Sequence, residues 1–213
     1  KETVSTPGAP DGSMPPMEFV VTAATGGQDS TFKGLKPRAI LDIMAWAVAH
    51  ASPEAAKTDQ AALKDKLRAA MPVFQNFSGV TTIDQMTVGT MAGQFGLDRL
   101  EVTVDGNGVV DEGRLREMFK VSGLTLPEGA IPPFATGLVP TSFTIDFNIA
   151  DFNLAAPARI FIDNFDLSQD PPLKPELEQQ LMQALLPKGA VTIGLGPSEF
   201  IAKVFNLKAE GSM

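Results

Sequence analysis

The chain of 213 residues contains no cysteine and a single histidine, His50. The absence of cysteine excludes disulfides, a thiolate nucleophile and cysteine-ligated zinc. Any Ser-His-Asp, Cys-His or multi-histidine metal site would have to share His50 or do without it, so such sites are disfavoured. His50 follows Trp46 by about one helical turn in an apolar segment. This position favours a packed or capping histidine over a catalytic one.

Basic residues and long apolar runs are also scarce. The 17 Lys and Arg residues are outnumbered by 25 Asp and Glu, which gives a net charge of −8 and a pI near 4.7. Without a dense basic stripe, no nucleic-acid partner is expected, and simple electrostatic attachment to anionic lipid is disfavoured. The most apolar stretch, 39–51, is interrupted by Asp42 and His50. It is shorter than the roughly 20 residues of a membrane span, so no transmembrane segment is expected in this chain.

Glycine and proline are abundant, with 19 and 17 residues, which favours many turns in an otherwise globular composition. Residues 1–16 are polar and rich in proline and glycine, and we expect them to form a flexible leader. Helices are predicted over 37–50 and 60–71. The first has so wide an apolar arc that it is expected to be the buried, central element of the fold.

The rest of the chain mixes strand and helix patterns. Residues 143–149 alternate apolar and polar side chains, which predicts a half-buried strand. Leu115, Met118 and Phe119 share a helical spacing, which predicts a short helix over 111–121. The remaining expected elements are two strands within 17–35 around a turn at 26–29, strands at 81–90, 95–104, 190–195 and 200–209, and a helix at 175–186. Residues 158–165 fit either a helix or a strand, and the preceding Pro157 favours a helix.

Matching landmarks point to an internal duplication. Phe32 and Pro37 recur as Phe152 and Pro157 at one offset of 120, and in both places a predicted strand enters a helix. Phe95 matches Phe200 further along. The alternative is chance similarity between strand-helix units that begin with proline.

The duplication predicts an α+β fold of two tandem similar units, each an antiparallel sheet packed on helices, in one elongated body. The first unit would cover residues 17–108 and the second 141–213. A helix followed by a Pro/Gly-rich connector would occupy 109–140 between them.

Short segments spread along the chain also carry a resemblance to a known family. They are Ala45-Trp46-Ala47-Val48-Ala49-His50, Asp105-Gly106-Asn107-Gly108-Val109-Val110, Leu126-Pro127 and Leu138-Val139-Pro140-Thr141. The sequence resembles alphaproteobacterial secreted proteins classified only as a domain of unknown function. The resemblance implies a periplasmic or otherwise extracytoplasmic location in a bacterium, and it assigns no catalytic residue.

Two motifs resemble ligand loops but lack essential residues. The segment 105–111 is similar to an EF-hand loop, yet Thr103 and Arg114 stand where the loop needs carboxylates, so no metal is expected. The segment 194–196, Gly-Leu-Gly, follows a predicted strand as a dinucleotide loop would. Glu199 replaces the third glycine, and we expect no cofactor.

Acidic residues in the second half of the chain leave one enzymatic alternative open. Two of them could approach each other as an acid/base pair of a carboxylate-dependent envelope hydrolase, although solvated carboxylates are the simpler expectation. These residues are Asp146, Asp151, Asp163, Asp166 and Asp170.

The preferred interpretation is a non-enzymatic envelope protein. It would bind an apolar ligand such as a lipid, or support an assembly through an envelope protein partner, because an apolar helix is present and a catalytic set is not. The residues expected to contact such a ligand lie on the predicted helix 37–50, and they are Ile43, Met44, Trp46 and Ala47.

Overall fold

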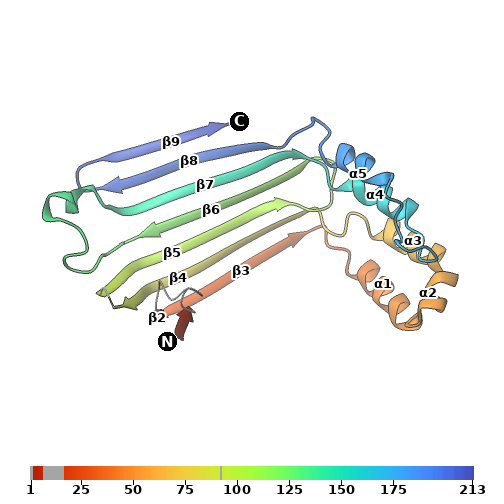
Figure 1. Ribbon diagram of the computed structural model, residues 1–213, viewed down its shortest axis with the longest axis horizontal. Coiled ribbons are helices and arrows are strands. Elements are labelled where there is room, and N and C mark those ends of the chain that lie inside the picture. Colours follow the sequence, from red (N-terminus) through yellow and green to blue (C-terminus); the bar gives the residue numbers. More distant parts are fainter. Residues whose placement is uncertain (1, 7–16, 92) are drawn as a thin grey trace, which may run out of the picture.

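The computed structural model describes residues 2–6, 17–91 and 93–213, and its main feature is one antiparallel sheet. The nine strands are β1 (Glu2–Thr6), β2 (Met17–Thr22), β3 (Thr25–Lys33), β4 (Asn76–Thr90), β5 (Gly93–Asn107), β6 (Gly113–Ser122), β7 (Pro140–Phe152), β8 (Thr192–Ala202) and β9 (Asn206–Ser212). Their spatial order is β1-β2-β4-β5-β6-β7-β8-β9, and β3 lies beside the first part of β4 (Figure 1).

Five α-helices gather beyond one end of this sheet (Figure 1). They are α1 (Pro37–Ala49), α2 (Pro53–Thr58), α3 (Gln60–Ala70), α4 (Ala155–Asn164) and α5 (Leu177–Leu185). The first three connect β3 to β4 and the last two connect β7 to β8, so each helical group joins two neighbouring antiparallel strands. Segregation of helices from an antiparallel sheet is the α+β arrangement that the sequence predicts.

Local sequence signals explain where the helices begin and end. Pro37 is the first residue of α1, where its missing N–H costs nothing, and His50 is the C-cap. The Ser52 hydroxyl caps α2 by accepting the Ala55 N–H at 3.2 Å. The predicted helices at 37–50, 60–71, 158–165 and 175–186 are confirmed as α1, α3, α4 and α5, with α4 beginning earlier, at Ala155.

Several expectations about the strands are wrong. The segment predicted as a helix over 111–121 is strand β6, in the middle of the sheet. Residues 26–29 lie inside β3 rather than in a turn, and β2 and β3 both pair with β4 instead of with each other. The strands expected at 190–195 and 200–209 have other bounds, because β8 runs without a break from Thr192 to Ala202 and β9 begins at Asn206. Within the expected leader, Glu2–Thr6 forms β1 paired with β2, while residues 1 and 7–16 lie outside the described residues.

The expectation that the helix at 37–50 is central and buried is also wrong. In α1 only Trp46 is buried, with 8% of its surface exposed. Among the described elements of the structure, α1 has extensive contacts only with helix α3. The apolar arc is therefore covered on one side only, because the helix lies beside the sheet end instead of being wrapped by the sheet.

One landmark of the duplication falls on non-equivalent strands. Phe95 lies in β5, the second strand after the first helical group, whereas Phe200 lies in β8, the first strand after the second group. By contrast, Phe32 and Phe152 both lie in strands that lead into helices. The match between Phe95 and Phe200 is therefore not a structural equivalence.

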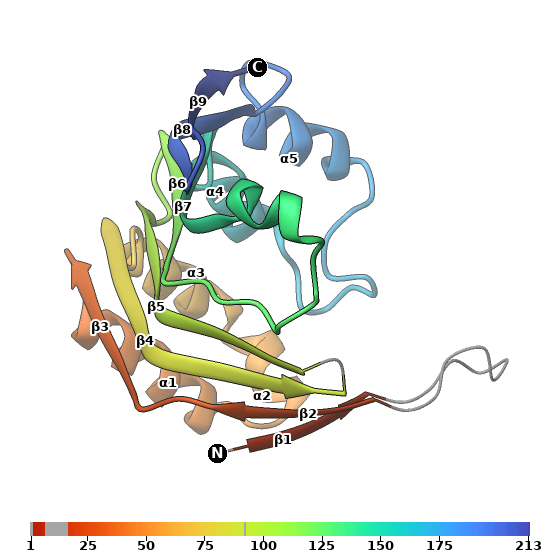
Figure 2. The ribbon, with the colours of Figure 1, turned by 90° about the vertical axis from the view of Figure 1, so that its left-hand side faces the viewer.

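The sheet is strongly curved. Figure 2 shows the strands as an arc, with the helices and the connector 123–139 on its concave side. The connector contains a 3-10 helix (Pro133–Leu138) and is tied to the sheet at both ends. Thr125 pairs with Gly96 of β5 through backbone hydrogen bonds of 2.8 and 3.0 Å, and the Val204 N–H donates to the Gly137 carbonyl at 3.3 Å. The helices therefore lie at one end of the concave side, and this connector lies at the other end.

Candidate functional site: the concave face of the sheet

The register of the central strands sorts apolar and polar side chains onto opposite faces. Directly paired residues share a face, so Val102 of β5, Phe119 of β6 and Ile145 of β7 lie together. The same register makes a continuous surface across five strands, which we call the concave apolar face. Its members are Phe77, Val102, Val104, Leu115, Phe119, Val121, Phe143, Ile145, Phe147, Ile149, Ile193, Leu195 and Phe200.

The concave apolar face is unevenly covered. Val121 at its middle is 7% exposed, but Phe147 and Ile193 towards the second half are 46% and 47% exposed. Glu117, paired with Phe147, is an exposed charged residue within this face. Large apolar side chains that stay in contact with water on a concave surface are typical of a binding surface.

Aromatic contacts stiffen both halves of this face. Phe74, just before β4, meets the rings of Phe32 and Phe77 edge-on, at centroid distances of 5.5 and 6.1 Å. Phe143 and Phe200 stack at 5.8 Å across β7 and β8. Such pairs stabilise by about 1 kcal/mol beyond the area they bury.

A pocket of about 180 Å³ opens on the concave apolar face at β3, β4 and β5. Phe32, Phe77, Val102 and Val104 form its apolar wall, and Gln28 is among its polar lining residues. Because Phe32 is 53% exposed, this pocket opens towards the free edge of β3. Its size suits one end of an apolar chain rather than a whole large ligand.

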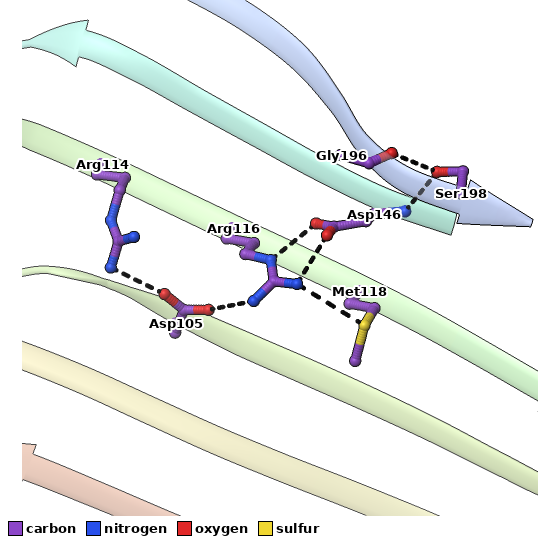
Figure 3. Close-up of polar contacts among 7 residues, drawn as sticks. All are labelled: Asp105, Arg114, Arg116, Met118, Asp146, Gly196 and Ser198. Atoms are coloured by element: carbon purple, nitrogen blue, oxygen red, sulfur yellow. Dashed lines mark hydrogen bonds and ion pairs between the residues drawn. The ribbon is translucent and has the colours of Figure 1, made fainter. Parts of the chain in front are cut away.

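The convex face carries a network of ion pairs instead (Figure 3). Arg116 donates to both oxygens of Asp146, at 2.8 and 2.7 Å, and lies 3.8 Å from Asp105. Arg114 donates to Asp105 at 3.1 Å. The Asp146 carboxylate raises the pKa of the Arg116 guanidinium above its ordinary value by accepting these hydrogen bonds. Each of these four charged groups therefore has a partner of opposite charge within the sheet.

A bulge in β8 accommodates Asp146, which is only 3% exposed. The Asp146 N–H donates to the Ser198 hydroxyl at 3.1 Å, and that hydroxyl donates to the Gly196 carbonyl at 3.0 Å. A Cβ at Gly196 would lie 2.5 Å from the Asp146 carboxylate, and one at Gly194 would overlap the Asn148 amide. The Gly-Leu-Gly segment is therefore explained by close packing of β8 on β7 side chains.

The residues predicted to bind the ligand are split between two sides of α1. Trp46 is buried and Ile43 is half-buried, whereas Met44 and Ala47 are exposed. The Trp46 indole N–H donates to the Asp59 carboxylate at 2.9 Å. None of the five best-formed pockets among the described residues is lined by any of these four side chains. Their role in ligand binding remains a prediction.

His50 acts at the end of α1. Its ring stacks on Trp46 at 4.5 Å, and its Nδ1 lies 2.8 Å from the Trp46 carbonyl oxygen. Its Nε2 lies 3.1 Å from the Asp59 carboxylate. Both ring nitrogens thus face acceptors in a helix cap, which confirms the expected capping role.

Three further acidic residues of the second half, Asp151, Asp163 and Asp166, have separate partners. Asp151 accepts hydrogen bonds from Lys188 and Thr192, Asp163 pairs with Arg68, and Asp166 accepts bonds from Ser168 and Gln60. The Lys188 ammonium is the main cause that lowers the pKa of Asp151, and the Ser168 hydroxyl holds that of Asp166 well below its usual range. A general acid needs a raised pKa, so Asp151 and Asp166 are poorly suited to that role in the hydrolase alternative.

A second pocket, of about 400 Å³, lies between the two helical groups. Met71, Val110 and Ile162 line it with apolar surface. Arg68 with Asp163, and Arg159 with Asp111, place two ion pairs on its wall at 2.7 and 3.0 Å. Because each charge already has a partner, this pocket offers neither an unpaired nucleophile nor an open anion site.

Asp105, the first residue of the segment that resembles an EF-hand loop, lies in strand β5 and is paired with arginines. Among the described residues, no cluster of three or more His, Asp or Glu side chains is placed to hold a metal ion. No helix in the described part of the chain has the length and apolar character needed to cross a membrane.

Comparison with known proteins adds no relative. No protein-family model, curated protein or solved structure matches this chain. The resemblance to alphaproteobacterial secreted proteins and the extracytoplasmic location remain predictions. The concave apolar face, with its exposed apolar side chains, is the feature of the molecule that suggests a function.

Proposed function

We propose that the protein binds an apolar ligand, such as the acyl chain of a lipid, along the concave apolar face. The observation that carries this proposal is the exposure of Phe147 and Ile193, at 46% and 47%, on a continuous apolar face of the curved sheet. Covering such side chains contributes about 25 cal/mol per Å² of apolar surface removed from water. An extended apolar chain lying across β6, β7 and β8 would provide this cover without any catalytic group.

A bacterial envelope location forms part of this proposal. It is supported by the resemblance of short segments such as Leu138-Val139-Pro140-Thr141 to secreted proteins of alphaproteobacteria. In that location a lipid is an available ligand.

The duplication is likewise proposed, in a revised form. A strand, a helical group and two further strands occur in this order twice, as β3, α1–α3, β4, β5 and as β7, α4–α5, β8, β9. Within both sets the three strands are neighbours in the same order. A superposition that pairs β4 with β8 and β5 with β9 tests this relation, and helices that diverge in direction would contradict it.

The ligand test compares two isoleucines on one strand. Ile193 lies on the concave apolar face and Ile201 on the convex face of β8, with exposed fractions of 47% and 40%. Ile193→Glu should weaken binding of a dansyl-labelled fatty acid at least about tenfold, because the new carboxylate would be buried by the ligand without a partner. Ile201→Glu should bind the probe as the unmodified protein does.

Native mass spectrometry of protein purified from its own cells supplies the second measurement. A lipid that co-purifies with the unmodified protein and is lost in Ile193→Glu is the expected result. Equal loss in Ile201→Glu, or no binding of lipid or of the labelled fatty acid, would contradict the proposal and favour an assembly scaffold.

A further inference from the structure

The outer side of α1 is an exposed apolar helix face. Leu41, Met44 and Val48 are 62%, 59% and 80% exposed, and their i, i+3 and i+7 spacing places them on one side of the helix. The opposite side carries the buried Trp46 and packs against α3. This apolar face is distinct from the concave apolar face of the sheet and has no cover within the described part of the chain.

The segment that carries this helix face, residues 33–68, is basic in sequence, although the protein as a whole is acidic and α1 itself also carries the exposed Asp42. Residues 33–68 contain seven Lys or Arg and four Asp or Glu, a net charge of +3. The rest of the chain contains ten Lys or Arg and 21 Asp or Glu, a net charge of −11. Arg38, in the first turn of α1, and Lys57, in α2, are exposed. Neither forms a salt bridge with any other described residue.

From this arrangement we propose that α1 docks the protein on an anionic lipid surface. Leu41, Met44 and Val48 enter the boundary between headgroups and acyl chains, as the apolar side of an interfacial helix does. Arg38 and Lys57 approach the lipid phosphates, which attract cations near the membrane surface. The acidic remainder of the chain is repelled, so the side of the molecule that carries α1 and α2 is directed towards the membrane.

Charge argues against a second copy of this chain as the occupant. A two-fold dimer through α1 would bring two regions of net charge +3 together. An anionic bilayer instead complements both the apolar side chains and the cations around them. Docking through α1 does not require a ligand on the sheet, so this inference stands independently of the proposed function.

The test is co-sedimentation with vesicles made of equal parts of phosphatidylglycerol and phosphatidylcholine, compared with vesicles of phosphatidylcholine alone. The unmodified protein should sediment with the anionic vesicles and much less with the neutral ones. Met44→Glu should lower the partition coefficient at least about tenfold, because it places a carboxylate at the anionic boundary. Arg38→Gln and Lys57→Gln should each lower it about fivefold, and their effects should shrink at high salt.

Met91 provides the matched control. It is 88% exposed and lies in the turn between β4 and β5, at the sheet end away from the helices (Figure 1). Met91→Glu should sediment as the unmodified protein does, and so should the ligand variant Ile193→Glu. Absence of binding to anionic vesicles, or equal loss in Met44→Glu and Met91→Glu, would overturn the proposal. So would a dimer that Met44→Glu dissociates in solution while vesicle binding is unchanged.

Discussion

The two faces of the sheet use the same strands in opposite ways. On the convex face, Arg116, Asp146 and Asp105 form a closed network in which each charge has a partner. On the concave face, Phe147 and Ile193 have nearly half of their surfaces in water. Strand alternation places one set outward and the other inward, so a single sheet can be internally satisfied on one side and open on the other. The ion pairs therefore stabilise the convex side, and the concave side is the surface on which we propose that the ligand binds.

The largest expected effect on stability comes from removing the Arg116 guanidinium from the ion-pair network of the convex face. Arg116→Met would leave Asp146, which is 3% exposed, as a buried carboxylate without its guanidinium. We expect the free energy of unfolding to fall by about 3 kcal/mol, measured by urea denaturation. Arg114→Met is the control and should cost less than about 1 kcal/mol, because the Arg114 side chain is 57% exposed. If the two variants lost the same free energy of unfolding, the burial of Asp146 would not make its pair with Arg116 more important than the pair of Arg114 with Asp105.

Removing the other partner of the same pair should cost less. Asp146→Asn leaves the Arg116 guanidinium 40% exposed and still 3.8 Å from Asp105. A loss of about 1 to 2 kcal/mol is expected from the changed hydrogen bonds. A loss larger than that of Arg116→Met, in the same denaturation measurement, would reverse the proposed asymmetry between the buried and the exposed partner.

Acid should weaken the ionic contacts of the fold and spare the apolar ones. Hydrogen bonds from Lys188 and Thr192 lower the pKa of Asp151, and those from Arg159 and Asn153 lower the pKa of Asp111. A lowered folded-state pKa means that the stabilisation is complete above the unfolded value of about 4 and is lost as pH falls below it. Melting temperature should therefore decline below pH about 4, and Asp151→Asn should make that decline shallower. An unchanged slope in this variant would exclude Asp151 as a contributor.

The smallest effect on stability is expected on the concave face. Phe147→Ser should change the free energy of unfolding by no more than about 1 kcal/mol, because Phe147 is already 46% exposed. The same change should reduce the fluorescence of 8-anilinonaphthalene-1-sulfonate bound to the protein, since the dye reports exposed apolar surface. A large loss of stability with unchanged dye binding would mean that Phe147 serves the core instead of the ligand surface.

The candidate site was only partly accessible from the sequence. The alternation over 143–149 predicted strand β7 and separated Phe143, Ile145 and Phe147 from Asp146. The ligand residues were nevertheless predicted on α1, because its wide apolar arc suggested burial. Pairing of β7 with β6 and β8 is what assembles the apolar surface, and these partners are distant in the sequence. The spacing of Leu115, Met118 and Phe119 predicts a helix, and therefore gives no sign that Arg116 pairs with Asp146 across two strands.

The sequence by itself determined the elements whose signals are local. Pro37 begins α1, the alternation within 143–149 produces β7, and the 3.6-residue spacing of Leu177, Leu181 and Leu185 produces α5. Only the tertiary structure decided the state of 113–122. Leu115 and Phe119 fit both a helix and a strand, and pairing with β5 and β7 selects the strand. The exposure of α1 is also decided by the tertiary structure. The apolar arc shows which side of the helix could be buried, but it does not show whether the sheet lies close enough to cover that side.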